Sequence, residues 1–249
     1  EDGMAKSVID EVGENATYIH ADVKREADIK GLIDYTVEKM GRLDCMFNNA
    51  GAGGASGLIE NIPVEGWDET INLLLRSVFL GIKHAARVMK PQGSGSIIST
   101  ASVAGIQAGF GPHAYSACKA AIIHLTRTTA VELGASGIRV NCVCPGGIAT
   151  AIFGKGMGLS AEDADKTAER LKPVFNDLQP IKRAGLPADV AQAVLWLAGE
   201  YSNFVSGHAL VVDGAITGGR DWMGNNSAPS PLVGAIVRAF TPNLPQSSQ

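Results

Sequence analysis

Positive charge is in short supply in this sequence, and long hydrophobic runs are absent. Lysine and arginine number 21 against 25 acidic residues, for a formal net charge of −4 at pH 7, and no basic run occurs. This balance argues against nucleic acid or an anionic membrane surface as a partner. No apolar run reaches the about 18 residues that span a bilayer, and the opening EDGMAKSVID lacks the pattern of a signal peptide. We therefore expect no nucleic-acid partner and no membrane association.

Cysteine is scarce and poorly spaced for metal binding. The four cysteines are Cys45, Cys118, Cys142 and Cys144. The Cys-Val-Cys pair lacks zinc spacing and has no second ligand pair. Three histidines also lack a carboxylate or cysteine at ligand spacing: His84, His113 and His124. We expect no metal site and interpret the thiols as reduced core residues of a cytoplasmic protein.

Length and hydrophobic content favour a single large domain. A chain of 249 residues, 45% of them hydrophobic, can bury one sizeable core. Short apolar runs alternate with segments whose apolar residues repeat at helical spacing. The expected strands are residues 17–21, 43–47, 96–100, 138–144 and 209–213, and the expected helices are 4–12, 26–40, 64–90, 113–134 and 187–199.

This alternation predicts an α/β fold, a Rossmann-like doubly wound parallel sheet with helices on both faces. In such sheets ligands bind at the carboxyl ends of the strands. Several polar or glycine-containing motifs follow predicted strands directly: Asp22, NNAG at 48–51, Ser102, and PGGIAT at 145–150. We therefore expect these motifs to lie together at one edge of the sheet.

Tyr115 and Lys119 lie four residues apart in the segment AYSACKAA. On a helix, residues at i and i+4 share one face. An ammonium group held beside a phenol favours the phenolate, so we expect Lys119 to lower the pKa of Tyr115 from its reference value of about 10. Such a tyrosine can act as a general acid–base near neutral pH. The alternative is a buried ring beside a solvated lysine, because this spacing also occurs by chance.

Ser102 follows the predicted strand 96–100, where its hydroxyl could hydrogen-bond a substrate oxygen shared with the phenol. The alternative is a polar cap at a strand end. NNAG and PGGIAT each follow a strand, and RAGLPADVAQAVLWLA precedes SGHALVVDGA near the C-terminus. With these motifs in this order and spacing, the chain resembles the classical short-chain dehydrogenase/reductase family from about residue 8 to Ala215.

The resemblance implies an NAD(P)-dependent oxidoreductase that interconverts a secondary alcohol and a ketone by hydride transfer. It makes Ser102, Tyr115 and Lys119 the catalytic residues, with Tyr115 as the acid–base. The expected cofactor is NAD or NADP, with NAD favoured, and the sequence alone does not decide between them. The cofactor-binding positions carried over from the family are Asp22, Val23, Asn49, Ala50, Gly51, Tyr115, Lys119, Pro145, Gly146, Ile148 and Thr150.

Some of these positions have plainer alternatives. The resemblance places Asp22 against the adenine amino group, but Asp22 could instead be the N-cap of the helix at 26–40. Asn48 and Asn49 could mainly brace their turn through local hydrogen bonds to the backbone. The turn at 145–150 could be an ordinary exit from a strand.

Two family features are absent. The glycine-rich turn that binds pyrophosphate at a helix N-terminus does not occur, and GAGGASG at 51–57 is not followed by a clear helix start. We therefore expect an N-terminally incomplete chain whose parent binds NAD(P), with the strand at 17–21 lacking an evident neighbour. Leu74 stands where family members usually carry an asparagine that helps hold a water near the lysine. We expect a weakened or rerouted proton relay.

We expect one domain at 1–215 and a C-terminal extension at 216–249. In the family, the helices that correspond to 64–90 and 113–134 pair between subunits. A homodimer or homotetramer is therefore expected.

The segment at 151–180 is the one that closes over the substrate in the family. Here it begins with FGKGMGL and continues with apolar residues at helical spacing. Together with the neighbouring Phe110, this apolar lid suggests a hydrophobic or cyclic small-molecule substrate.

Two other functions stay open. Leu74 and the missing glycine-rich turn suggest a non-catalytic family member or fragment that acts as a binding or assembly module. An epimerase or dehydratase of the extended subfamily would share the Tyr–Lys pair. The compact RAGLP…VVDG region argues against this second possibility, because those enzymes usually have a larger substrate domain.

Overall fold

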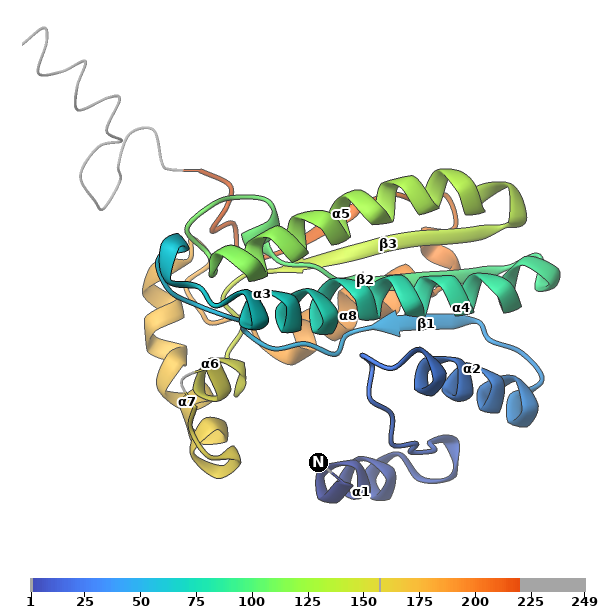
Figure 1. The fold of residues 1–249 in the computed structure, drawn as a ribbon, viewed down its shortest axis with the longest axis horizontal. Coiled ribbons are helices and arrows are strands. Elements are labelled where there is room, and N and C mark those ends of the chain that lie inside the picture. Colours follow the sequence, from blue (N-terminus) through green and yellow to red (C-terminus); the bar gives the residue numbers. More distant parts are fainter. Residues whose placement is uncertain (1, 157, 220–249) are drawn as a thin grey trace, which may run out of the picture.

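The computed structural model describes residues 2–156 and 158–219 (Figure 1). Its centre is a parallel four-stranded sheet with the strand order β1-β2-β3-β4. The strands are β1 (Cys45–Asn48), β2 (Gly95–Thr100), β3 (Ile138–Pro145) and β4 (Ala209–Val212). The helices are α1 (Asp2–Val12), α2 (Glu26–Met40), α3 (Val64–Ile71), α4 (Ser77–Gln92), α5 (His113–Leu133), α6 (Ile152–Gly156), α7 (Ala161–Leu178) and α8 (Pro187–Ala198).

Helices cover both faces of the sheet, as the α/β prediction requires. In Figure 1, α4 and α5 lie in front of the strands and α8 lies behind them, while α6 and α7 lie near the carboxyl ends of the strands. Side chains alternate between the two faces: Ile97 and Val140 join the core under α4 and α5, whereas Ile98 and Val143 pack with Leu197 of α8. The sheet is therefore buried on both sides, which explains its continuous apolar strands.

Most predicted elements are confirmed within a few residues, but the strand expected at 17–21 is wrong. These residues have no regular secondary structure, and Tyr18 is 44% exposed. In the described part of the chain, β1 pairs with β2 alone. An apolar run becomes a strand only where a neighbouring strand satisfies its backbone groups, and 17–21 has none beside it.

The helix predicted at 64–90 is continuous in direction but contains a π-turn. Five residues, Asn72–Arg76, adopt this wider turn between α3 and α4. Just before this turn, the Cys118 thiol of α5 donates a hydrogen bond to the backbone oxygen of Thr70 in α3, with a distance of 3.9 Å between sulfur and oxygen. Leu74 lies within the π-turn and is 1% exposed. Such turns often occur beside functional sites.

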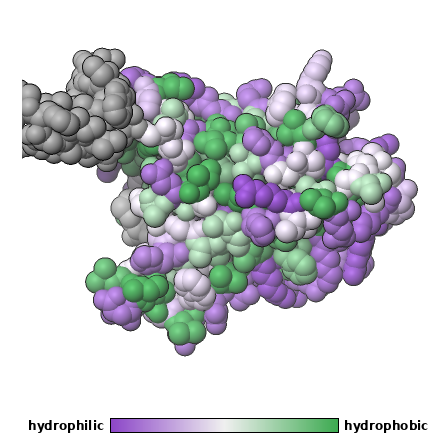
Figure 2. Space-filling model, turned by 90° about the horizontal axis from the view of Figure 1, so that it is seen from above, coloured by the Kyte–Doolittle hydropathy of each residue, from purple (hydrophilic) through white to green (hydrophobic). Residues whose placement is uncertain are grey.

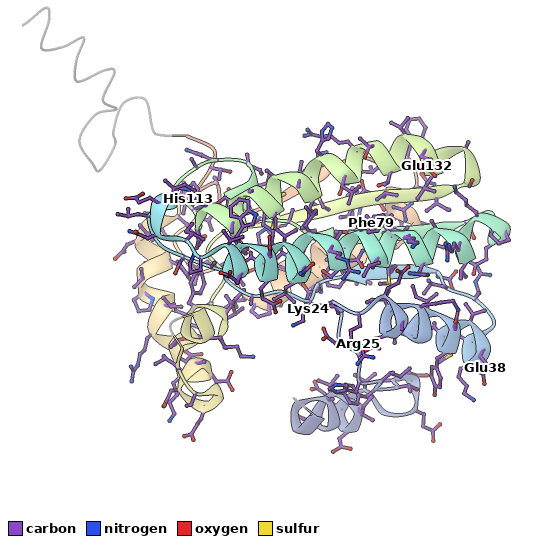
Figure 3. All side chains as sticks on the ribbon, viewed as in Figure 1. Lys24, Arg25, Glu38, Phe79, His113 and Glu132 are labelled. Atoms are coloured by element: carbon purple, nitrogen blue, oxygen red, sulfur yellow. The ribbon has the colours of Figure 1, made fainter. Side chains whose placement is uncertain are left out.

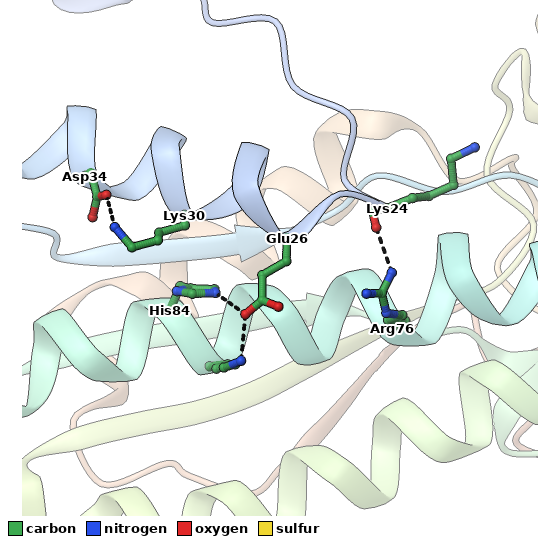
Figure 4. A network of polar contacts seen from close by, with 7 residues as sticks. Lys24, Glu26, Lys30, Asp34, Arg76 and His84 are labelled. Atoms are coloured by element: carbon green, nitrogen blue, oxygen red, sulfur yellow. Dashed lines mark hydrogen bonds and ion pairs between the residues drawn. The ribbon is translucent and has the colours of Figure 1, made fainter.

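Glu26 joins α2 to α4 (Figure 4). One of its oxygens accepts hydrogen bonds from Lys83 Nζ at 2.6 Å and from His84 Nε2 at 2.9 Å. These two partners hold the pKa of the Glu26 carboxyl below its usual value. Nearby, the Arg76 guanidinium donates to the Lys24 backbone oxygen at 2.8 Å. The two contacts hold α2 and the loop before it against α4.

The described helices include none that is long and apolar enough to cross a membrane. Of the extension predicted at 216–249, residues 216–219 are described, and the rest lies outside the described residues.

Arg139 in β3 closes the C-terminal end of α8. Its guanidinium donates to the backbone oxygens of Leu197 (2.7 Å), Ala198 (3.2 Å) and Gly199 (3.2 Å), and to Ser202 Oγ (2.9 Å). Carbonyl oxygens at a helix C-terminus lack intrahelical partners, and a cation there also complements the helix dipole.

We predict that Arg139→Met lowers the free energy of unfolding by about 2 kcal/mol, because it removes the charged donor from three carbonyl oxygens, of which Leu197 O and Gly199 O keep a hydrogen bond from Ser202 Oγ. Urea unfolding followed by circular dichroism measures this change. Arg139→Lys is the matched control, since it retains one charged donor and should lose less. Equal stability of Arg139→Met and the native chain would contradict the capping role.

Candidate functional site

Tyr115 and Lys119 lie on one face of α5, one turn apart. The Lys119 Nζ atom is 5.4 Å from the centroid of the Tyr115 ring. This confirms the arrangement that the four-residue spacing predicts. Tyr115 is partly buried, whereas Lys119 is 5% exposed. A lysine so deeply buried contradicts the alternative of a solvated side chain.

Ser102 joins this pair from the exit of β2. Its hydroxyl lies near enough to the Tyr115 phenol to affect the pKa of the phenol, and it accepts a hydrogen bond from the backbone N–H of Ala104 at 3.1 Å. Ser102 therefore caps the short helical turn Val103–Gly105, and its hydrogen bond to a substrate oxygen stays a prediction.

Two glycines let the loop after Ser102 lie directly against α5. A Cβ on Gly105 would fall 2.5 Å from the backbone carbon of Lys119. A Cβ on Gly111 would fall 2.8 Å from Cδ1 of Tyr115. Either side chain would push the loop away from the helix, so the close approach of Ser102 to Tyr115 depends on these two positions.

The expected lowering of the Tyr115 pKa is wrong for this structure. Burial raises the pKa of the Tyr115 phenol, and the nearby Ser102 hydroxyl offsets only part of this increase. The physical reason is the direction of Lys119: its Nζ donates to the backbone oxygen of Thr100 at 2.6 Å and lies near the ring rather than pairing with the phenol oxygen. Burial also lowers the pKa of Lys119 itself, to about 8.

Thr100 is the residue that sequence reasoning missed. Its backbone oxygen accepts from Lys119, and its hydroxyl donates to Asn49 Oδ1 at 2.8 Å. Thr100 thereby links the lysine to the end of β1. Its place at the end of a predicted strand, two residues before Ser102, was the available signal, but nothing in its residue type singled it out.

The residues that follow β1 are open to solvent. Asn49, Ala50 and Gly51 are exposed, and a Cβ on Gly51 would fall 3.1 Å from Leu74 Cδ2. Asn48 donates to Ser99 Oγ at 3.3 Å, a side-chain contact with the neighbouring strand β2 rather than the local backbone hydrogen bond considered for it. Leu74 presents a buried apolar side chain at the position where a polar one was expected in relatives.

The turn at 145–150 is held from two sides. The Gly146 N–H donates to the Val212 oxygen at 3.0 Å, and a Cβ on Gly146 would fall 2.6 Å from the Asp213 Cβ. Beyond it, Ile148 forms a bridge with Gly185. The turn is thus tied to β4 and to the segment before α8, which is more than an ordinary strand exit. Pro145, Gly146 and Thr150 are partly buried, and Ile148 is 9% exposed.

Asp22 and Val23 lie before α2, away from the Ser102–Tyr115 pair. Asp22 Oδ1 accepts from the Lys24 N–H, and the Asp22 N–H donates to Asp28 Oδ2, both at 3.0 Å. Arg25 occupies the N-cap position of α2. The alternative role of Asp22 as N-cap is therefore wrong, and its second carboxylate oxygen has no protein partner among the described residues.

His113 is exposed at the first position of α5 (Figure 3). It lies two residues before Tyr115, at the same end of the helix. No hydrogen bond or ion pair fixes its ring within the described residues, so the structure assigns it no packing role.

Comparison with known proteins gives a consistent result. A family model described as enoyl-(acyl carrier protein) reductase matches residues 1–217. Secoisolariciresinol dehydrogenase of Forsythia intermedia is 41% identical over 221 residues, covering 87% of this chain and 77% of the relative. The (+)-borneol dehydrogenase 2 of Salvia officinalis is 42% identical over 202 residues, covering 80% and 71%.

Solved structures agree with this result. Levodione reductase superposes with a TM-score of 0.70 at 34% identity, covering 80% of this chain and 76% of that one. ElxO with NADP bound gives a TM-score of 0.73 at 29% identity, covering 83% and 80%.

The buried Lys119 predicts a specific dependence of stability on pH. Its pKa is about 8 in the folded chain against 10.5 for an ordinary lysine, so between these values the unfolded chain binds more protons. Stability therefore rises with pH through this window. We predict that the free energy of unfolding of the native chain, minus that of Lys119→Met, increases by up to about 3 kcal/mol from pH 8 to 10.5.

Urea unfolding at several pH values checks this prediction. Groups common to both proteins, such as tyrosines and cysteines, cancel in the difference. Lys166→Met, at a largely exposed lysine, is the control and should give a flat difference. A flat difference for Lys119→Met as well would show that the ammonium is not desolvated.

Proposed function

The chain belongs to the classical short-chain dehydrogenase/reductase family, and from this premise we propose that Ser102, Tyr115 and Lys119 carry its catalysis. Members of this family are NAD(P)-dependent oxidoreductases, and this chain is one that interconverts a secondary alcohol and a ketone. The observation that carries the assignment is the convergence of Ser102, Tyr115 and Lys119 at the exit of β2. Their contacts support the proposal because the Ser102 hydroxyl lies near the Tyr115 phenol and the Lys119 ammonium lies beside the Tyr115 ring.

The phenol of Tyr115 exchanges a proton with the substrate oxygen. Because burial raises its pKa, the phenol is protonated at neutral pH and is ready to act as the acid when a ketone is reduced. Ser102 donates a hydrogen bond to the same substrate oxygen and fixes its position. Lys119 supplies positive charge beside the ring, and its contact with Thr100 fixes where that charge lies.

The described residues suit the nicotinamide, its ribose and the adenine of a nicotinamide dinucleotide better than they suit its pyrophosphate. The nicotinamide and its ribose could be held by the exposed backbone of Asn49–Gly51, by Lys119 and by the turn at 145–150. The adenine amino group could donate to the Asp22 carboxylate oxygen that has no partner among the described residues. No glycine-rich turn opens a helix in the described residues to receive a pyrophosphate. When bound, the nicotinamide would supply the hydride chemistry, and the protein would position the substrate and handle the proton.

We propose NAD rather than NADP as the preferred form. The Asp22 carboxylate, which has no ion-pair partner among the described residues, lies at the expected adenine edge and would repel a 2′-phosphate. The nearby cations are already paired, Lys24 with Glu69 at 2.8 Å and Arg25 with Asp28 at 3.6 Å.

The proposed substrate is a hydrophobic or cyclic secondary alcohol or its ketone. The segment that we propose as a lid contains α6 and α7, joined by the rings of Phe153 and Phe175 at 5.4 Å between centroids. Phe175 also packs with Ala149 of the turn at 145–150, so apolar side chains connect the lid to the site. Relatives named as borneol and secoisolariciresinol dehydrogenases support this class.

We further propose a homodimer or homotetramer that forms through α4 and α5 in the cytoplasm. Phe79 of α4 is 48% exposed and Val131 of α5 is 85% exposed. Figure 3 shows Phe79 on the outer side of its helix, and Figure 2 shows hydrophobic residues gathered among polar ones on the face seen from above. Free cysteines support the cytoplasmic location.

A second candidate function is a non-catalytic binding or assembly module. The buried Leu74 favours it, because an apolar side chain cannot hold a water beside Lys119. Fluorescence titration with NADH and NADPH separates the two functions. An oxidoreductase should bind NADH, and bind it more tightly than NADPH, whereas a module without a cofactor should bind neither.

We predict that Tyr115→Phe lowers the rate of alcohol oxidation by at least about 100-fold, because it removes the group that exchanges the proton. Absorbance of the reduced nicotinamide measures the rate over a panel of cyclic secondary alcohols. Tyr201→Phe, at a tyrosine that is 93% exposed, is the matched control and should keep the native rate. Equal rates for Tyr115→Phe and the native protein would refute the catalytic assignment.

A further inference from the structure

Thr100 lies at the point where the pairing between β1 and β2 stops. The last paired residues are Asn48 of β1 and Ser99 of β2, whereas Thr100 still pairs with Val143 of β3. The chain that leaves β1 at Asn49 therefore has no strand beside it in the described structure to satisfy its backbone and fix its direction. Its direction must come from other contacts.

One hydrogen bond ties the start of this segment to the rest of the described chain. The Thr100 hydroxyl donates to Asn49 Oδ1 at 2.8 Å. The next hydrogen bond along the segment is the one from the Ala55 N–H to Thr70 Oγ1 at 2.9 Å. Residues 50–54 form none with any part of the chain that the structure describes, and their sequence Ala-Gly-Ala-Gly-Gly has no side chain that could form one. The position of these residues therefore depends on the two ends of the segment.

Packing limits the segment on one side only. A Cβ on Gly51 would fall 3.1 Å from Leu74 Cδ2, and a Cβ on Gly54 would fall 2.5 Å from Thr70 Cγ2, so the backbone runs close to the helices. Apolar contact of this kind has no preferred direction. The hydrogen bond from Thr100 does have one, and it sets the direction in which the chain leaves β1.

The contact uses one end of the Asn49 amide and leaves the other free. Oδ1 accepts from Thr100, and Nδ2 has no partner among residues 2–156 and 158–219. Asn49 is exposed and directly follows the carboxyl end of β1, the edge of a parallel sheet where ligands bind. The amide hydrogens are therefore available to a ligand oxygen, while the Thr100 hydroxyl keeps the side chain from turning.

The backbone oxygen of Thr100 makes a separate contact, because it accepts from Lys119 Nζ at 2.6 Å. A substitution at Thr100 changes the side chain and leaves this oxygen in place. The contact with Asn49 can therefore be removed without removing the contact with Lys119.

We propose that Thr100 is a positioning residue of the cofactor site, whose hydroxyl holds Asn49 and the segment 50–54 in the direction that receives the dinucleotide. The inference rests on the proposed function, since it takes Asn49–Gly51 as cofactor contacts. Thr100 acts here through Asn49 and not by touching the cofactor itself.

Fluorescence titration of the full chain with NADH tests the proposal. We expect Thr100→Val, which keeps the branched shape and removes the hydroxyl, to raise the Kd about five- to tenfold, the usual effect of losing one neutral hydrogen bond. Thr100→Ser keeps the hydroxyl and should restore the native Kd. Thr128→Val is the matched control, because the exposed Thr128 hydroxyl bonds within its own helix, to the Leu125 oxygen at 3.0 Å. An equal Kd for Thr100→Val and the native chain overturns the proposal.

A double-mutant cycle shows whether Thr100 acts through Asn49. Asn49→Ala removes the acceptor, so adding Thr100→Val to it should cause no further loss of affinity for NADH. Additive losses overturn the proposal, because they would mean that the threonine acts by another route.

Two further readouts separate a positioning role from general damage to the site. The rise in stability between pH 8 and 10.5 that depends on Lys119 should persist in Thr100→Val, because the backbone oxygen that pairs with the lysine remains. In turnover, the KM for NAD should rise by the same factor as the Kd for NADH, with little change in kcat. Loss of the stability rise, or a fall in kcat without a change in KM, overturns the proposal.

The titration also separates this inference from the function on which it rests. A native chain that binds neither NADH nor NADPH overturns both. A native chain that binds NADH, with an affinity that Thr100→Val leaves unchanged, overturns the positioning role alone.

Discussion

The hydrogen bond from Lys119 to the Thr100 oxygen is the contact on which the site depends. It joins α5 to the end of β2 at 2.6 Å, in a place where the lysine is almost wholly buried. A buried ammonium needs a hydrogen-bond partner, so this contact fixes the direction of the side chain, while burial lowers its pKa to about 8. Through the Thr100 hydroxyl it also reaches Asn49 after β1. One lysine thus aligns the ends of two strands with the helix that carries Tyr115.

Local sequence patterns predicted the elements well because their causes are local. Continuous apolar runs such as 138–144 became central strands, and α2 ends at Gly41, whose φ of 76° is one that glycine adopts readily. The strand predicted at 17–21 is wrong because a strand also needs a neighbouring strand, and a short stretch of sequence gives no information about that neighbour. The π-turn at Asn72–Arg76 was not predicted either, since the sequence NLLLR contains neither glycine nor proline to mark an irregular turn.

At the site, the spacing of Tyr115 and Lys119 in the sequence predicted that their side chains lie close together, but it did not predict how deeply each side chain is buried. Four residues of separation placed Tyr115 and Lys119 together, yet the sign of the Tyr115 pKa shift follows from burial and from the direction of the ammonium. The same limit explains why Thr100 was missed. Its backbone oxygen acquires its importance from the lysine beside it in three dimensions, and Thr100 belongs to no recognisable motif.

The π-turn has a consequence for how this chain tolerates change. An extra residue in one turn rotates everything after it by about 100° relative to a regular helix. The faces that α3 and α4 present to α5 therefore match only because the bulge lies between them. Substitution at Leu74 leaves that phase intact, and deletion of one residue from Asn72–Arg76 would close the turn to a regular one with Val78 and Leu80 still facing the core. Straightening the turn without a deletion would instead rotate both side chains out of the core, so the wide turn accommodates one additional residue without moving the packed face.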